Sequence, residues 1–215
     1  MATASAHPNI TNMIFDKSEA VTLVIGDKKH EMIVHECYIT ANSEFFKTAL
    51  KKEWLVGQTR IITMPTEERK TMTDYLNFTY SGKLSTTCLT EESDDEAAAY
   101  LDSFPALAEL YTLGKRLLDL VVQNAVIKEF VRLFEAVYEF DTLYPPGQDS
   151  IDIIYEGTLH GDPARRLMRD MYLYWANDQF FEQETDRPFL HDVVQTLLPG
   201  EYDAGARLEV SDYLT

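Results

Sequence analysis

The segment HECYITANSEFF (residues 35–46) decides the fold, because it lies where a predicted strand gives way to a pair of short helices. Upstream of it the chain reads VTLVI, and the apolar residues Val21, Leu23 and Ile25 recur at every second position. That period is typical of a strand with one buried face. The apolar and hydroxyl residues of the segment indicate a structural framework and no catalytic chemistry.

A turn signal and a second extended stretch follow the first strand. Gly26-Asp27 favours a tight turn, and Met32 and Val34 resume the strand pattern, which together predict a β-hairpin. Ser43 is then expected to cap the next helix, because its hydroxyl can accept a hydrogen bond from a free amide of the first turn. The apolar residues of this helix are spaced as a single stripe that we expect to face the core: Phe45, Phe46, Ala49 and Leu50.

Residues 59–64 predict a third strand, which the following proline ends because proline cannot donate to a β-ladder. We expect the next helix to start at Thr66, with Glu67 and Glu68 in its first turn, where acidic side chains complement the helix dipole. Gly82 is placed to stop this helix. Its apolar side is formed by Met72, Tyr75, Leu76 and Tyr80.

Helical spacing continues in the second half of the chain. Ala106–Leu113 and Leu117–Phe134 are expected to be paired helices separated by Gly114. The acidic run at residues 91–96 predicts an exposed loop that leads into a helix. Ser93 in this loop suits an acid-directed kinase, although the favoured interpretation is a serine without that role.

Tyr144–Gly147 (YPPG) marks a boundary, because consecutive prolines cannot continue a helix. Shorter helices follow, with Pro163 and Pro188 suited to their first turns. We expect one apolar cluster there to belong to the core, with a partner groove as the alternative. It comprises Met168, Met171, Tyr172, Leu173, Tyr174 and Trp175.

The composition predicts a globular protein of one or two domains. The chain has 215 residues, of which 45% are hydrophobic and 12% aromatic. No stretch approaches the roughly 20 apolar residues of a membrane helix. An intracellular protein, cytoplasmic or nuclear, with Cys37 and Cys88 reduced is therefore expected.

The net charge of −17 belongs to the second half, since residues 1–90 hold ten basic and ten acidic residues. Phosphate backbones and anionic lipid heads are bound through Lys and Arg, so direct nucleic-acid and membrane binding are not expected. We interpret the acidic surplus as a solvated surface, with steering of a basic partner as the alternative.

Catalytic, cofactor and metal sites are not expected. His35 and Cys37 lie two apart, as in some nucleophile pairs, but no third group stands out to orient the base. A zinc site built from these two residues and His30 would lack the fourth ligand of a closed site. The nine glycines are scattered and form no phosphate-binding loop.

Residues 20–84 resemble a BTB/POZ domain. The resemblance rests on the spacing of a set of residues: His35, Ile39, Ala41, Ser43, Phe46, Ile61, Pro65, Tyr75, Tyr80, Gly82 and Leu84. Residues 109–127 and 154–172 resemble the helical continuation of a fungal branch of this family. The implied fold is α+β, with a small three-stranded sheet flanked by helical hairpins and an all-α C-terminal extension.

The resemblance implies three segments: a flexible leader over residues 1–18, a BTB/POZ-like domain with its following helices over 19–138, and a helical extension over 148–215. It also implies a non-enzymatic scaffold or adaptor that binds itself or other proteins. The alternatives are a substrate receptor of a cullin-type ubiquitin ligase and a transcription-linked corepressor module that acts through a partner.

Two positions depart from the family pattern. Ala20 stands where an Asp commonly opens the first core strand, which with the short leader argues against a domain-swapped homodimer. Val56 stands where cullin-binding members tend to carry Glu, and the loss of a carboxylate at an interface costs affinity unless Glu53 substitutes for it.

The candidate partner-binding residues form an apolar patch that leads into a loop: Phe46, Leu50, Trp54, Leu55 and Val56. A tryptophan carries roughly 150 to 250 Å² to bury, so either the core or a partner is expected to cover Trp54. The sequence leaves monomer and dimer open.

Overall fold

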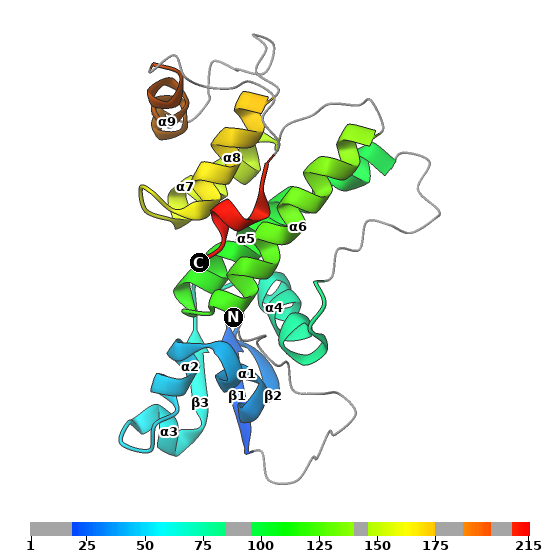
Figure 1. The fold of residues 1–215 in the computed structure, drawn as a ribbon. Helices are drawn as coiled ribbons and strands as arrows, with labels where there is room; N and C mark the ends of the chain where they lie inside the picture. Colours follow the sequence, from blue (N-terminus) through cyan, green and yellow to red (C-terminus); the bar gives the residue numbers. More distant parts are fainter. Residues whose placement is uncertain (1–18, 85–95, 140–145, 175–186, 199–207) are drawn as a thin grey trace. The chain divides into compact units, whose positions relative to one another are not determined.

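The computed structural model describes residues 19–84, 96–139, 146–174, 187–198 and 208–215 (Figure 1). The predicted leader and Ser93 lie outside these ranges. The chain divides into two compact units: residues 1–85 with 113–123 form unit 1, and residues 86–112 with 124–215 form unit 2.

Unit 1 contains the predicted hairpin. Strands β1 (Ala20–Ile25) and β2 (His30–His35) pair antiparallel, and β3 (Ile61–Met64) pairs parallel with β1. The strand order is therefore β2-β1-β3, with β1 in the middle (Figure 1). The alternation expected for β1 is confirmed, because its residues 21, 23 and 25 are completely buried.

Three helices of unit 1 lie between β2 and β3 in the chain, α1 (Glu36–Asn42), α2 (Glu44–Ala49) and α3 (Leu55–Thr59), and α4 (Arg69–Ser81) follows β3. With the sheet they confirm the predicted α+β class. The predicted cap of α2 is also confirmed, since the Ser43 hydroxyl accepts a hydrogen bond from the Phe46 amide at 3.2 Å. The short helix α3 was not foreseen, because five residues carry too little periodicity to predict one.

The predicted start of α4 at Thr66 is wrong, since the helix begins at Arg69. Glu67 does not lie in its first turn but is buried and binds Arg116 through two hydrogen bonds of 2.8 and 2.6 Å. That pairing holds the chain in a turn ahead of the helix. The predicted end is confirmed, because Gly82 caps α4 with a φ of +70°.

The helices α5 (Glu96–Arg116) and α6 (Leu120–Glu139) are present, but Gly114 does not separate them. The reversal lies at residues 117–119, where Leu118 has a φ of +51°. Gly114 is needed for close packing, since a Cβ there would lie 2.6 Å from a methyl group of Val122.

The turn between α5 and α6 is bound to α2 and α4 within unit 1. The Ser43 hydroxyl donates to the Leu117 carbonyl at 2.6 Å. Tyr75 of α4 donates to the Asp119 carboxylate at 3.0 Å, and the same carboxylate accepts from the amides of Val121 and Val122. Asp119 is thus both the N-cap of α6 and an anchor for α4.

Unit 2 includes the helices α7 (Gln148–Gly157), α8 (Pro163–Tyr174) and α9 (Arg187–Leu197), and a 3-10 helix at Val210–Tyr213. The predicted placement of Pro163 and Pro188 in first turns is confirmed. Met168, Met171, Tyr172 and Leu173 are buried as expected, whereas Trp175 lies outside the described ranges.

Unit 2 repeats the pairing of a tyrosine with an aspartate. The hydroxyls of Tyr111, Tyr155 and Tyr213 donate to the carboxylates of Asp162, Asp192 and Asp170 at 2.8 to 3.0 Å. Asp162 also accepts from the Ala164 amide and therefore caps α8. In the described part of the chain, no helix is long and apolar enough to cross a membrane.

We expect Tyr75→Phe to lower the free energy of unfolding. Asp119 is 1% exposed and would lose one of its hydrogen-bond donors, which costs about 1.5 to 3 kcal/mol for a buried charged group. Urea unfolding measures this loss. The matched control is Tyr38→Phe, because the Tyr38 hydroxyl forms no hydrogen bond with another described residue. Equal effects of the two substitutions would contradict the anchoring role of Tyr75.

We also expect stability to fall steeply above about pH 10, the ordinary pKa of tyrosine. Burial, and then the neighbouring aspartates, raise the pKa of the four paired tyrosines Tyr75, Tyr111, Tyr155 and Tyr213. The folded state holds these protons more tightly than the unfolded state. The contribution of the four tyrosines to the free energy of unfolding is therefore complete below about pH 10 and is lost as the pH rises through their pKa in the folded state. Tyrosinate absorbance should therefore rise together with loss of helical circular dichroism. Ionisation of these tyrosines in a folded chain at their ordinary pKa would contradict this.

Candidate functional site

An apolar groove of about 380 Å³ lies in unit 1 beside α2 and α3. We call it the Trp54 groove, and its lining residues are Glu44, Phe45, Thr48, Ala49, Trp54, Val56 and Leu118. α2 supplies four of them, the loop and helix after it supply Trp54 and Val56, and the turn between α5 and α6 supplies Leu118. Three separate stretches of sequence therefore meet at this groove.

Backbone contacts bring the α5–α6 turn to the groove. The amides of Glu44 and Phe45 at the start of α2 donate to the carbonyls of Leu118 and Leu117, at 3.4 and 3.3 Å. These carbonyls satisfy two amides that would otherwise have no partner in the first turn of a helix. The Leu118 side chain stays 59% exposed, so it forms an apolar rim.

The position of Trp54 depends on close backbone packing. Its amide donates to the Lys51 carbonyl at 3.0 Å, and its carbonyl accepts from the Gln58 amide at 3.2 Å. A Cβ at Gly57 would lie 2.1 Å from the same Lys51 carbonyl oxygen, so only glycine lets α3 approach this loop. The loop is therefore held in place while the indole projects outward.

The five partner-binding residues predicted from the sequence fall into two groups in the structure. Phe46 and Leu50 are core residues, with exposures of 0% and 5%. Trp54 and Leu55 are 58% and 74% exposed, and Val56 is half-buried in the groove wall. Leu55 is not among the lining residues.

The expected single core stripe of α2 is in fact two faces. Phe46 and Leu50 point into the core, whereas Phe45 and Ala49 are half-buried and line the groove with Thr48. The three- and four-residue spacing of positions 45, 48 and 49 could have indicated this second face. Leu118 could not be found in this way, because it comes from a distant turn.

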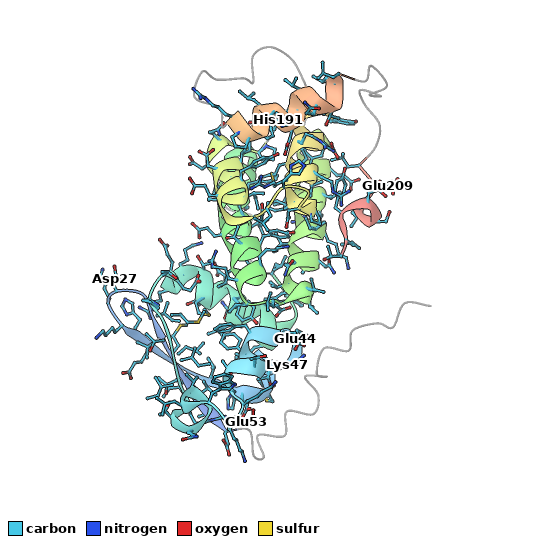
Figure 2. The ribbon with its side chains drawn as sticks, turned by 90° about the vertical axis from the view of Figure 1, so that its left-hand side faces the viewer. Asp27, Glu44, Lys47, Glu53, His191 and Glu209 are labelled. Atoms are coloured by element: carbon cyan, nitrogen blue, oxygen red, sulfur yellow. The ribbon has the colours of Figure 1, made fainter. Side chains whose placement is uncertain are left out.

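The rim of the groove is charged. Glu44 and Lys47, one turn apart on α2, form an ion pair of 2.5 Å and lie close together in Figure 2. Lys51, Lys52 and Glu53 in the loop before Trp54 are exposed. An apolar core with a polar rim is common in protein–protein interfaces.

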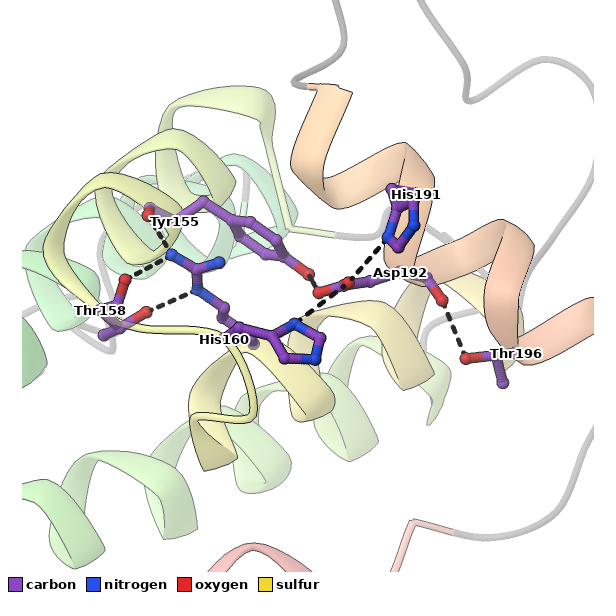
Figure 3. A network of polar contacts seen from close by, with 7 residues as sticks. Tyr155, Thr158, His160, His191, Asp192 and Thr196 are labelled. Carbon is purple, nitrogen blue, oxygen red and sulfur yellow. Dashed lines mark hydrogen bonds and ion pairs between the residues drawn. The ribbon is translucent and has the colours of Figure 1, made fainter.

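A second, polar hollow of about 440 Å³ lies in unit 2 between the α7–α8 loop and α9. Figure 3 shows its network: the Asp192 carboxylate accepts from the Tyr155 hydroxyl, and His160 and His191 lie 3.7 and 3.6 Å from it. Arg165 binds the carbonyls of Tyr155 and Thr158 and lies over the Tyr155 ring. Because the Tyr155 hydroxyl of α7 donates to the Asp192 carboxylate of α9, this polar network joins the two helices.

Of the two residues weighed for catalysis, His35 has a structural contact. His35 contacts the Tyr80 hydroxyl through its ring nitrogen at 2.9 Å. Cys37 is exposed and does not form a disulfide. Among the described residues, no group of three or more His, Cys, Asp or Glu could hold a metal ion.

Residues 15–117 match the family model of the BTB/POZ domain. Unit 1 has the small sheet and helices expected from the sequence resemblance. The matched residues, 15–117, are a BTB/POZ domain. Domains of this family are typically non-enzymatic modules for protein–protein interaction and self-association. The chain matches no curated protein.

We expect Trp54→Ala to have little effect on stability, in contrast to Phe46→Ala. Removing the fully buried Phe46 side chain should lower the free energy of unfolding by about 3 to 5 kcal/mol. The indole of Trp54 is mostly in water, so its removal should cost less than about 1 kcal/mol. Denaturant unfolding of both variants checks this. A loss at Trp54 as large as that at Phe46 would make the indole a core residue.

Proposed function

We propose that the chain is a non-enzymatic scaffold or adaptor that holds a protein partner in the Trp54 groove. The observation that carries the proposal is the exposure of Trp54 beside an apolar hollow. A tryptophan in water is costly, and tryptophans at the centre of an interface often supply a large share of the binding energy. Leu55 and Leu118 extend the exposed apolar surface.

The groove defines the chemistry of the partner. Its floor suits one or two apolar side chains, such as those that an amphipathic helix presents at positions i and i+3 or i+4. The exposed charges of Lys51, Lys52 and Glu53 suit a partner surface that carries both signs. Apolar contact would supply most of the affinity, and these charges would select the orientation.

Cullin-type scaffolds are a second candidate for this partner. In the family, cullin-binding members carry their contact motif just before the third strand, and here that stretch contains Trp54, Leu55 and Val56. The family carboxylate is absent, but Glu53 is exposed on the same loop and forms no ion pair with another described residue. The exposed carboxylate of Glu53 therefore supports the hypothesis that Glu53 takes the place of the missing family carboxylate. The corepressor alternative stays a prediction from the sequence.

Light scattering on a sizing column tests the proposal, with the full chain alone and mixed with a purified cullin N-terminal domain. We expect either a dimer or a one-to-one cullin complex, which Trp54→Ala and Leu118→Asp both dissociate. Leu118→Asp suits the backbone, since Asp tolerates a positive φ, and it places a charge at the rim of the groove.

Leu159→Ala is the matched control, because Leu159 is 83% exposed, belongs to unit 2 and is not a lining residue of the groove. It should leave any complex unchanged. A self-association that depends on Trp54 and ignores cullin supports a scaffold, and a cullin complex that depends on Trp54 supports a ligase receptor. A monomer that ignores cullin, or a complex that survives both groove substitutions, would contradict the proposal.

A further inference from the structure

Strand β2 is an edge strand in the described part of the chain. The sheet order is β2-β1-β3, so β1 covers one side of β2 and no described strand pairs with the other side. An open edge is a template for another strand unless charges, proline or a covering element protect it. On β2 the middle of this edge carries Ile33, which is 77% exposed.

The register shows which backbone groups of β2 are open. Thr22 of β1 lies opposite Ile33, and the Thr22 amide donates to the Arg60 carbonyl on the β3 side at 2.9 Å. The Thr22–Ile33 pair is therefore one of the pairs without hydrogen bonds between β1 and β2. By the alternation of antiparallel pairing, the amide and carbonyl groups of Glu31 and Ile33 point away from β1.

The next outward amide along β2 is already occupied. The His35 amide donates to the Tyr80 hydroxyl of α4 at 2.9 Å. That hydroxyl stands where an added strand would place a carbonyl oxygen, so Tyr80 closes one end of the edge. The open part is limited to Glu31 and Ile33.

A groove of about 680 Å³ runs beside this edge, between β2 and α4. Val34 and Leu76 form a buried apolar part of it, and Met32 and Tyr80 are half-buried there. Apolar side chains on one face of an added strand would rest against these residues. Backbone pairing and side-chain pockets would thus occur together, as in recognition by strand addition.

The open end of the groove carries one charge of each sign, Arg69 on α4 and Glu31 on β2. From the Tyr80–His35 contact, Arg69 lies about 16 Å back along α4 and Glu31 lies about 13 Å back along β2, so both belong to the far end. Arg69 is exposed and forms no ion pair with any described residue. A carboxylate on the incoming strand would find its partner there.

We propose that the β2 edge binds an extended segment of a partner protein as a fourth strand. The segment has apolar residues at alternate positions and a carboxylate at the end that meets Arg69. This surface shares no residue with the Trp54 groove, and the proposal does not rest on the function proposed for that groove.

A second copy of the chain fits this edge less well than a foreign segment. Antiparallel pairing of two β2 edges would place Glu31 opposite Glu31 or opposite Ile33, which is a like-charge or a mismatched pair. The register that places Ile33 opposite Ile33 would also pair Glu31 with His35, whose amide is already bound to Tyr80, so only the two bonds between the Ile33 residues remain. Self-pairing is therefore the outcome that the test must exclude.

The probe is a phage-displayed library of random linear peptides, selected on the immobilised full chain. We expect enriched sequences with alternating apolar residues and an acidic end. A selected peptide, made synthetically with a fluorescent label, is then titrated by anisotropy. Amide exchange measured by NMR should show rapid exchange at Glu31 and Ile33 in the free chain and protection of both in the complex.

Two substitutions at Ile33 should prevent strand addition and leave the hydrogen bonds between β1 and β2 in place. Ile33→Pro removes an outward amide that β1 does not use, and proline is tolerated at such edge positions. Ile33→Lys keeps the amide and adds an edge charge. Each should weaken peptide binding by at least about tenfold. Ile61→Lys is the matched control, since Ile61 is a 48% exposed residue on the opposite edge of the sheet, and it should leave binding unchanged.

Slow exchange of the Met32 and Val34 amides in both Ile33 variants verifies that the hairpin is intact. Three results would overturn the proposal: no enrichment over an unrelated protein, selected peptides that bind the Ile33 variants as well as the parent chain, or protection of the Glu31 and Ile33 amides by self-association without peptide.

Discussion

The buried carboxylate of Asp119 is the group on which the arrangement of unit 1 depends. It is 1% exposed and accepts hydrogen bonds from the Tyr75 hydroxyl and from two amides at the start of α6. A buried charge is tolerated only when such donors surround it. Together with the bond from Ser43 to Leu117, this fixes the α5–α6 turn against α2 and α4, and the same turn carries Leu118 to the Trp54 groove.

The aspartates also change the interpretation of the net charge. The acidic surplus of the second half suggested a solvated surface, yet Asp162 is buried, and the side chains of Asp170 and Asp192 are only 18% and 15% exposed. Each accepts a hydrogen bond from a tyrosine hydroxyl. Part of the negative charge therefore holds unit 2 together, and a basic partner would meet only the remaining exposed acids.

Local signals in the sequence predicted the parts of the fold that short stretches determine. The alternation in β1, the cap at Ser43 and the stop at Gly82 each need only a few neighbouring residues. The start of α4 was missed because the Glu67–Arg116 pair joins residues 49 apart. Gly114 was read as a break for a similar reason, since its close neighbour Val122 lies on another helix. At the groove, residues 54 to 56 could be named from sequence, but Leu118 could not.

Gly57 fixes the backbone that presents two exposed apolar side chains. Any side chain there would strike the Lys51 carbonyl, so the backbone of the loop tolerates no replacement at that position. Trp54 and Leu55, a few residues earlier, are mostly in water and contribute little to the core. Substitutions at positions 54 and 55 therefore change the exposed surface with little effect on the core, while Gly57 preserves the backbone that presents these two side chains.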